Sequence, residues 1–320
     1  MTQAIIAHEL VKTYPGEVRA LDGLSLSADS GMIFALAGPN GAGKSTTFKI
    51  LTTLSRPDTG SARVAGIDVL RQPERVRQAI GVVGQKTGAT PEATGSENLV
   101  MQGEIYGLSG RALRQRVNQL LDRFDLREAA DRPTKTFSGG MRRRLDVALG
   151  LVHRPQVLFL DEPTTGLDPD ARASLWLEIE RLAGDGAMTI LLTTHYLDEA
   201  DRLADHLAIV DRGRIVTQGP PETLKRELRG DAIQLELEAA PSDGRVTAAL
   251  LALPGLSEIL ADGRIVRARA EHGASAIPGL LGALEREGFA VSSVTLARPS
   301  LDDVYLRHTG HLYTKHDERE

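Results

Sequence analysis

Strand-like and helical patterns of apolar residues alternate over about the first 220 residues. The runs Ile33–Ala37, 157–160 and Thr189–Thr194 are mainly apolar and lack the polar alternation of a half-exposed strand. Strands that are buried on both faces have this pattern, and they usually lie in a mainly parallel sheet. The amphipathic helical patterns between them predict helices on the faces of that sheet. We therefore expect an α/β body.

Residues 92–136 interrupt this alternation. Helical patterns at 98–106, 112–124 and 126–130 follow one another without a strand-like run between them. Consecutive helices of this kind do not continue the sheet. They predict a helical subdomain inserted into the α/β body, over about residues 92–150.

The pattern changes again after Gly219, Pro220 and Pro221, which interrupt regular structure. We expect one domain over residues 1–220, a linker over 221–230 with a short helical stretch at 223–228, and a small α+β domain over 231–310. The strands of this second domain are predicted at 233–238, 265–270 and 290–296, and its helices at 246–251, 278–287 and 301–307. Residues 311–320 lack periodicity and are predicted to form a frayed tail.

Composition narrows the function only slightly. Apolar residues make up 41% of the 320 residues and charged residues 25%, as in ordinary globular proteins. The absence of cysteine excludes disulfides, thiolate catalysis and Cys-ligated zinc. The net charge of -5 provides no long-range attraction to nucleic acid. Because no apolar run reaches the ~20 residues that span a bilayer, and no signal peptide is evident, we expect a cytoplasmic protein.

The segment GPNGAGKS at residues 38–45 matches the phosphate-loop pattern GxxxxGK[ST]. It follows the predicted strand Ile33–Ala37 and precedes a helical pattern at 46–51, so backbone N–H groups and a helix N-terminus can face phosphate oxygens. Lys44 is expected to neutralise β/γ oxygens, and Ser45 to ligate Mg²⁺. The alternative is a Gly-rich turn without a ligand. The predicted nucleotide-binding residues of this segment are Gly38, Pro39, Asn40, Gly41, Ala42, Gly43, Lys44, Ser45 and Thr46.

Asp161 and Glu162 follow the apolar run 157–160. Ligands of open α/β sheets bind at the carboxyl ends of the strands, where the first acid of such a pair can hold Mg²⁺. Glu162 would then polarise the attacking water, because phosphoryl transfer to water needs a well-placed proton acceptor. A solvated strand end is the alternative.

The segment FSGGM at residues 137–141 resembles the LSGGQ signature of ATP-binding cassette (ABC) ATPases. The other motifs of this family occur in its order: Tyr14 as the aromatic that stacks on adenine, the phosphate loop, Gln85 in the Q-loop, the signature, Asp161-Glu162, Gly166-Leu167-Asp168 as the D-loop, and His195 as the switch histidine. The resemblance covers about residues 4–220. It implies the phosphate-loop NTPase fold of ABC ATPases with its helical subdomain, and Mg-dependent ATP hydrolysis.

Phe137 and Met141 stand where the general signature has Leu and Gln, but the Ser138 hydroxyl and the Gly139 and Gly140 amides remain. Residues 138–146, SGGMRRRLD, are similar to ATPase subunits of ABC-2 type daunorubicin/doxorubicin-resistance exporters. The segment PSLDDVY at 299–305, with a Thr-Gly pair at 309–310, is similar to the carboxyl end of the same group. This resemblance implies drug or antibiotic export through a separate membrane permease.

The family's residue roles follow from the same resemblance. It implies catalytic roles for Glu162, His195, Gln85 and Lys44, Mg²⁺ ligation by Ser45, Gln85 and Asp161, and nucleotide contacts from Tyr14, the phosphate loop, Ser138, Gly139 and Gly140. ATP and Mg²⁺ are the expected ligands.

Two copies are expected to close head to tail on an ABC-2 type permease at the cytoplasmic face of the membrane. Each nucleotide would lie between one copy's phosphate loop and the other's signature, and the permease would contact the groove near Gln85 and residues 86–106. The domain at 231–310 is expected to serve assembly or regulation. The alternative is a non-transport ABC protein acting on the ribosome or DNA, but residues 46–220 contain no second cassette and no long coiled coil.

Two groups of charged residues are interpreted as solvated helix faces and not as binding sites. They are the basic run Arg142, Arg143 and Arg144, and the acidic group Asp198, Glu199, Asp201 and Asp205. We expect no nucleic-acid contact from the first group.

Overall fold

The computed structural model describes residues 2–184, 188–228, 230–241, 244–297 and 299–313. Residues 314–320 of the predicted tail lie outside this description. The chain divides into two compact units, one up to Pro221 and one from Glu222 to Tyr313, and each contains its own hydrophobic cluster. Among the described residues, no helix combines the length and the apolar composition needed to cross a membrane.

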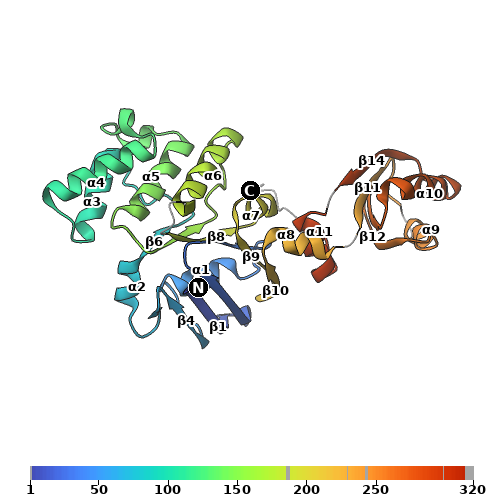
Figure 1. Cartoon of the computed structure of the whole chain (residues 1–320), viewed down its shortest axis with the longest axis horizontal. Helices are drawn as coiled ribbons and strands as arrows, with labels where there is room; N and C mark the ends of the chain where they lie inside the picture. Colours follow the sequence, from blue (N-terminus) through green and yellow to red (C-terminus); the bar gives the residue numbers. More distant parts are fainter. Residues whose placement is uncertain (1, 185–187, 229, 242–243, 298, 314–320) are drawn as a thin grey trace. The chain divides into compact units, whose positions relative to one another are not determined.

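A six-stranded sheet forms the centre of the first unit (Figure 1). Its strands are β3 (Ile33–Ala37), β6 (Ile80–Val83), β7 (Val157–Asp161), β8 (Thr189–Thr194), β9 (His206–Asp211) and β10 (Arg214–Gly219). They lie in the order β10-β9-β3-β8-β7-β6, and only β10 runs antiparallel to its neighbour. Strands β3, β7 and β8 are buried at every position, which confirms the predicted mainly parallel sheet.

A second, antiparallel sheet was not predicted from the sequence. It contains β1 (Gln3–Tyr14), β2 (Val18–Asp29), β4 (Thr59–Val64) and β5 (Ile67–Asp68), in the order β2-β1-β4-β5. The register of β1 shifts between Ala7 and Leu10, and Glu9 adopts a left-handed φ of +51°. A bulge of this kind moves the following side chains to the opposite face. The period-two pattern that predicts a strand is therefore lost.

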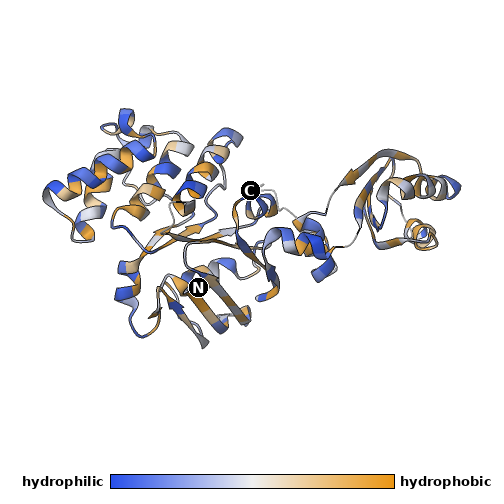
Figure 2. Ribbon diagram, in the orientation of Figure 1, coloured by the Kyte–Doolittle hydropathy of each residue, from blue (hydrophilic) through white to orange (hydrophobic). Residues whose placement is uncertain are grey.

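Helix α1 (Lys44–Leu51) packs into the cluster that the two sheets share. Phe48, Ile50 and Leu51 are buried there, and the Phe48 ring meets Phe159 of β7 edge to face, with centroids 5.9 Å apart. Figure 2 shows apolar residues concentrated along the strands of this unit. Burying a side chain of this size contributes roughly 1.5–3 kcal/mol. The phosphate loop is thus followed by a helix that the core holds in place.

The remaining helices of the first unit include the predicted helical subdomain. They are α2 (Pro73–Ala79), α3 (Gly95–Ile105), α4 (Gly110–Arg123), α5 (Gly139–Leu151), α6 (Pro169–Gly184) and α7 (Leu197–Leu203). Helices α3, α4 and α5 lie together (Figure 1), and no strand interrupts this part of the chain. Helix α3 begins with a capping box in which Thr94 and Glu97 each accept the other's backbone N–H.

The prediction of a helix at 126–130 was wrong. This segment forms a single 3₁₀ turn, η1 (Arg127–Ala129), and another, η2 (Thr134–Thr136), precedes the signature. Asp125 has a left-handed φ of +51°, which ends the preceding helix.

The second unit begins within α8 (Pro221–Glu227) and contains a four-stranded antiparallel sheet. Its other elements are β11 (Asp231–Leu237), α9 (Arg245–Leu251), β12 (Leu256–Asp262), β13 (Ile265–Ala270), α10 (Gly273–Arg286), β14 (Val291–Ala297) and α11 (Leu301–Thr309). The strands lie in the order β12-β13-β11-β14, which with the two helices gives a β-α-β-β-α-β arrangement. Strand β12 was not predicted. It contains a register shift between Ser257 and Leu260 and a left-handed Glu258, the same disturbance as in β1.

The motif at residues 299–305 begins the last helix of the second unit. Ser300 and Asp303 form a capping box, with the Ser300 backbone N–H donating to Asp303 at 2.9 Å. Asp303 Oδ2 also lies 3.3 Å from Nη2 of Arg269, a β13 residue that is only 4% exposed. Arg269 Nε donates to Glu258 Oε2 at 2.8 Å. The motif therefore connects α11 to the sheet of this unit.

Candidate nucleotide site

The phosphate loop connects β3 to α1 through backbone conformations that require glycine. Gly38 has a φ of +154°, and a Cβ atom there would lie 2.2 Å from the Val210 carbonyl oxygen. Gly43 has a φ of +112°, and its Cβ would lie 2.6 Å from the Ala20 carbonyl oxygen. Neither position can hold a side chain. The motif glycines are thus needed for the packing of the loop, besides leaving its N–H groups accessible to an anion.

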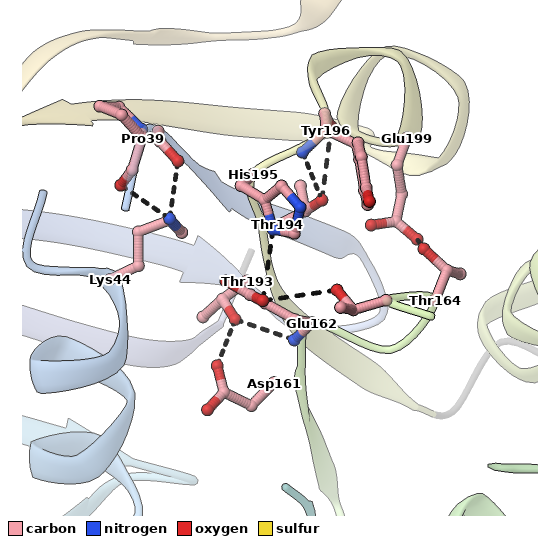
Figure 3. Close-up of polar contacts among 12 residues, drawn as sticks. Pro39, Lys44, Asp161, Glu162, Thr164, Thr193, Thr194, His195, Tyr196 and Glu199 are labelled. Atoms are coloured by element: carbon pink, nitrogen blue, oxygen red, sulfur yellow. Dashed lines mark hydrogen bonds and ion pairs between the residues drawn. The ribbon is translucent and has the colours of Figure 1, made fainter. Parts of the chain in front are cut away.

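Lys44 is the first residue of α1 and is only 4% exposed. Its Nζ donates hydrogen bonds to the carbonyl oxygens of Gly38 at 2.6 Å and Pro39 at 2.9 Å (Figure 3). Burial lowers the pKa of this amine, whereas the carboxylates of Glu162 and Asp161 act in the opposite direction. The amine is therefore held against the loop by carbonyl oxygens that phosphate oxygens could replace.

The two acids at the end of β7 lie in different environments. Asp161 is 8% exposed, and Thr193 Oγ1 from β8 donates to its Oδ1 at 2.5 Å (Figure 3). Burial raises the pKa of Asp161 above its ordinary value, although this hydrogen bond opposes the shift. Glu162 has a left-handed φ of +45°, and its N–H donates to the Thr193 carbonyl oxygen at 3.1 Å. This backbone conformation is rare outside glycine and occurs more often at functional sites.

Glu162 forms a polar pair with the histidine that follows β8. His195 Nδ1 lies 3.2 Å from Glu162 Oε2, and Thr165 Oγ1 donates to the same oxygen at 3.4 Å. Burial raises the pKa of Glu162, but the hydrogen bond from His195 and the charges of His195 and Lys44 outweigh burial and lower it. The pKa values of the two adjacent acids are thus shifted in opposite directions, as expected where neighbouring acids have different roles. The shift at Glu162 favours its carboxylate form.

A cleft of about 520 Å³ brings the phosphate loop together with residues that are distant in sequence. Tyr14 at the end of β1, Gln85 after β6, and Glu162 all line it. Tyr14 is half-buried and Gln85 is exposed. The phosphate-loop residues that line the cleft are Asn40, Gly41, Gly43, Lys44, Ser45 and Thr46.

Known proteins share both parts of this chain. Residues 21–165 match the ABC transporter family, and residues 219–309 match the C-terminal domain of DrrA1-3-like ATP-binding proteins. The chain is 45% identical to the daunorubicin/doxorubicin resistance ATP-binding protein DrrA of Streptomyces peucetius, over 97% of this chain and 93% of that protein. The chain belongs to the DrrA family of ABC-transporter ATP-binding proteins. The predicted family is therefore confirmed.

Other relatives of this ABC protein agree. The Nod factor export ATP-binding protein I of Ralstonia nicotianae is 38% identical over 96% of this chain and 94% of that protein. Among solved structures, cbiO1 from Clostridium perfringens has a TM-score of 0.65 at 27% identity, covering 71% of this chain and 92% of that chain. A dimeric ATP-binding cassette bound to ADP and Pi has a TM-score of 0.62 at 25% identity, covering 68% and 98%. The chain is an ATPase that powers export, and the ribosome or DNA alternative is not favoured.

The signature lies outside the cleft of its own chain. Ser138, Gly139 and Gly140 do not line that cleft, and Ser138 and Gly139 are exposed at the start of α5. Ser138 Oγ caps this helix by accepting the Met141 N–H at 3.2 Å. Phe137 is buried, and a Cβ on Gly95 would lie 3.3 Å from its ring, so this side chain packs closely against Gly95 within the first unit. One copy thus contains the phosphate loop and an outward-facing signature.

The predicted solvated basic face was wrong for Arg143. Only 8% of this residue is exposed, and its guanidinium donates to backbone carbonyls near the ends of β6 and β7. Sequence reasoning also missed Asp146, another buried residue of α5. The sequence does indicate that Arg143 lies on a buried helix face, because Val147 and Gly150 follow it at the i+4 and i+7 positions of that face.

The predicted solvated acidic face was wrong for Glu199, whereas Asp198 and Asp205 are exposed. Glu199 is 1% exposed, and its Oε1 accepts hydrogen bonds from Thr164 Oγ1 at 2.8 Å and Trp176 Nε1 at 2.9 Å. Burial raises its pKa, and these hydrogen bonds only partly oppose the rise. Helix α7 buries this position because Ala200 and Leu203 pack on the same side.

Proposed function

We propose that the cleft binds Mg-ATP and that Glu162 is the general base for ATP hydrolysis. The observation that carries the proposal is the convergence of Tyr14, the phosphate loop, Gln85 and Glu162 on one cleft. Tyr14 offers an aromatic face for adenine at one end, and the loop amides and Lys44 offer donors for the phosphates. Glu162 lines the same cleft, where a carboxylate can accept the proton of an attacking water.

The residues around the loop suit Mg²⁺. The Ser45 hydroxyl, the Gln85 amide oxygen and the Asp161 carboxylate are hard oxygen donors, which Mg²⁺ prefers together with phosphate oxygens and water. Asp161 is oriented by Thr193, whose hydroxyl donates a hydrogen bond to Oδ1. When bound, the ion would neutralise charge on the transferred phosphoryl group.

His195 is proposed to position Glu162. With its proton on Nδ1, the ring donates to Glu162 Oε2, which holds the carboxylate at one angle and keeps it ionised. The ring also lies 4.0 Å from the Tyr196 ring, centroid to centroid, which restricts its rotation. In this arrangement Glu162 takes the proton, and Lys44 stabilises the charge on the phosphate oxygens.

A second copy of the chain is proposed to complete each site. Ser138, Gly139 and Gly140 present a hydroxyl and the N-terminal N–H groups of a thirteen-residue helix to the surface. Such a helix end favours an anion. The dimeric cassette bound to ADP and Pi supports a dimer. In the proposed head-to-tail arrangement, the signature of one copy would meet the γ-phosphate held by the other.

The permease is proposed to be of the ABC-2 type and to contact the groove beside the Q-loop. This groove has a volume of about 110 Å³ and is lined by Val82, Lys86 and Gln102 among others. Helix α3 also exposes Met101 and Ile105, one turn apart, at 40% and 77%. Exposed apolar side chains beside a groove suit a protein partner. Attachment through the permease would hold the chain at the cytoplasmic face of the membrane.

Drugs or antibiotics are the proposed cargo, because the names of the DrrA relatives specify daunorubicin and doxorubicin resistance. The test is to co-express the chain with its membrane partner and measure ATPase stimulation by anthracyclines. Stimulation that Lys44→Ala abolishes would support drug export, whereas stimulation only by Nod factor would contradict it.

The docking site can be tested separately by single-cysteine crosslinking, since the chain has no native cysteine. Gln102→Cys should crosslink to the permease, and Ser293→Cys, on an exposed position of β14, should not. Crosslinks from Ser293→Cys alone would contradict the proposed groove.

A further inference from the structure

Helix α5 carries two buried charged side chains behind the signature. Its N-terminus is capped by Ser138, and Arg143 and Asp146 are 8% and 7% exposed. Buried charged groups are costly unless they are paired and fully hydrogen-bonded. The partners of these two groups therefore indicate what they hold in place.

Arg143 joins the ends of two neighbouring parallel strands. Its Nη1 donates to the Gly84 carbonyl oxygen at 2.6 Å, just beyond β6. Its Nε donates to the Pro163 carbonyl oxygen at 2.7 Å, and its Nη2 to those of Asp161 at 3.0 Å and Glu162 at 3.3 Å, at the end of β7. Only a guanidinium has the planar fork of donors that reaches all of these acceptors.

Asp146 lies one helical turn further along and holds the next part of the Q-loop. Its Oδ1 accepts hydrogen bonds from Thr87 Oγ1 at 2.8 Å and from the Gly88 N–H at 3.0 Å. Burial raises the pKa of Asp146, while these bonds and the charge of Arg143 act in the opposite direction. The opposite charges of Arg143 and Asp146 thus stabilise each other, in addition to the hydrogen bonds that each residue makes.

Gln85 lies between these two attachment points. Arg143 holds the residue before it and Asp146 holds the second and third residues after it, so both ends of this short loop are bound to α5. Arg143 also holds the carbonyl of Glu162, whose left-handed φ of +45° needs support from its surroundings. One helix therefore contacts the Q-loop and the backbone of the acid, and presents the signature at its own N-terminus.

We propose that Arg143 and Asp146 are positioning residues. Through their hydrogen bonds, the loop that contains Gln85 and the backbone of Glu162 move together with the signature helix. The inference rests on the proposed roles of Gln85 and Glu162. A displacement at the Q-loop is then passed through α5 to the signature, and through Arg143 to Glu162. Neither residue lines the proposed nucleotide cleft, so both act on the rate of hydrolysis through the groups they hold.

The test uses the full-length chain and measures steady-state ATPase activity together with binding of a fluorescent ATP analogue. Arg143→Gln should lower kcat on the order of 100-fold, the cost of a displacement of about 1 Å at a reacting group, and leave analogue affinity unchanged. Arg143→Lys keeps the charge but cannot reach both strands, so it should recover only part of the loss.

Arg116→Gln is the matched control. Arg116 also donates to backbone carbonyls of the α5 region, at 2.6 Å to Leu151 and 3.3 Å to Val152, but at the opposite end from the signature. It should lower the melting temperature as Arg143→Gln does, without changing kcat. An equal loss of kcat in both variants would overturn the proposal, because it would reduce Arg143 to a purely structural role.

Asp146 is tested with Asp146→Asn and Asp146→Leu. The amide keeps an oxygen for Thr87 and Gly88 and should retain most activity, whereas Asp146→Leu should lower kcat. Combining Asp146→Leu with Gln85→Ala should add little to the loss from Gln85→Ala alone, since both act through the same loop. Full additivity would overturn the coupling.

A second double-mutant cycle, between Arg143 and Glu162, separates this inference from the proposed function. In single-turnover hydrolysis, Arg143→Gln should cause a much smaller loss in a Glu162→Gln background than in the wild type, because Arg143 acts through Glu162. If Glu162→Gln itself keeps wild-type turnover, the proposed catalytic base is wrong. If Glu162→Gln is inactive but Arg143→Gln is as active as the wild type, only the positioning role is wrong.

Discussion

The Glu162→Gln substitution removes one negative charge from the cleft and leaves the shape of the side chain unchanged. An amide oxygen can still accept from His195 Nδ1, 3.2 Å from the present carboxylate oxygen, and from Thr165. Both Glu162 and His195 are almost buried, at 11% and 12% side-chain exposure, so bulk water is poorly placed to substitute for the lost base. The variant should therefore fold and bind ATP but fail to accept a proton.

The expected loss follows from what a general base supplies. Such a base contributes about 10²–10⁴-fold in rate, which corresponds to about 3–5 kcal/mol of transition-state stabilisation. The pKa of Glu162 is lowered, so in the wild type the carboxylate is fully ionised at neutral pH. Protonation of Glu162 should thus lower the wild-type rate only below pH 4.5, which is the ordinary pKa of a glutamate.

The assay is phosphate release under saturating Mg-ATP, with ATP-analogue binding measured on the same preparations. Glu180→Gln is the control, because it makes the same substitution in a surface pair with Arg202 at 3.4 Å. We expect kcat to fall at least 100-fold in Glu162→Gln alone, with analogue affinity retained. Turnover within a few fold of wild type, or a loss of binding that matches the loss of rate, would refute the assigned role.

Three further predictions concern stability. Gly38→Ala should destabilise the first unit by about 1–3 kcal/mol in thermal unfolding, because its Cβ would lie 2.2 Å from the Val210 carbonyl oxygen; an unchanged melting temperature would contradict this loop geometry. Glu199→Gln should raise the melting temperature, because the folded-state pKa of Glu199 is raised and ionisation therefore opposes folding as pH rises above 4.5. The gain in melting temperature should be absent near pH 4 and grow toward pH 8. A gain that does not depend on pH would refute the raised pKa as its cause. Arg269→Leu should destabilise the second unit by about 1–3 kcal/mol, since it removes the cation that faces Glu258 and Asp303, with ATP binding retained as the control.

Strands β3, β7 and β8 were predicted correctly because their pattern depends on burial alone. β3, β7 and β8 are buried at every position, and their apolar runs predict this directly. Strands β1 and β12 were missed, because each contains a left-handed glutamate and a register shift that break the alternation. A bulge depends on the partner strand, so it has no reliable signal in the strand's own sequence.

The sequence by itself determined the family, the order of its motifs and the phosphate loop, because the loop glycines, a lysine and a serine act over a few consecutive residues. Only the tertiary structure decided which distant residues share a site. It joined Tyr14, Gln85 and Glu162 in one cleft, and it shifted the pKa values of Asp161 and Glu162 in opposite directions. It also buried Arg143 and Glu199, whose charge alone suggested solvent. Burial, pairing and pKa depend on neighbours supplied by other segments, and the local sequence does not contain those neighbours.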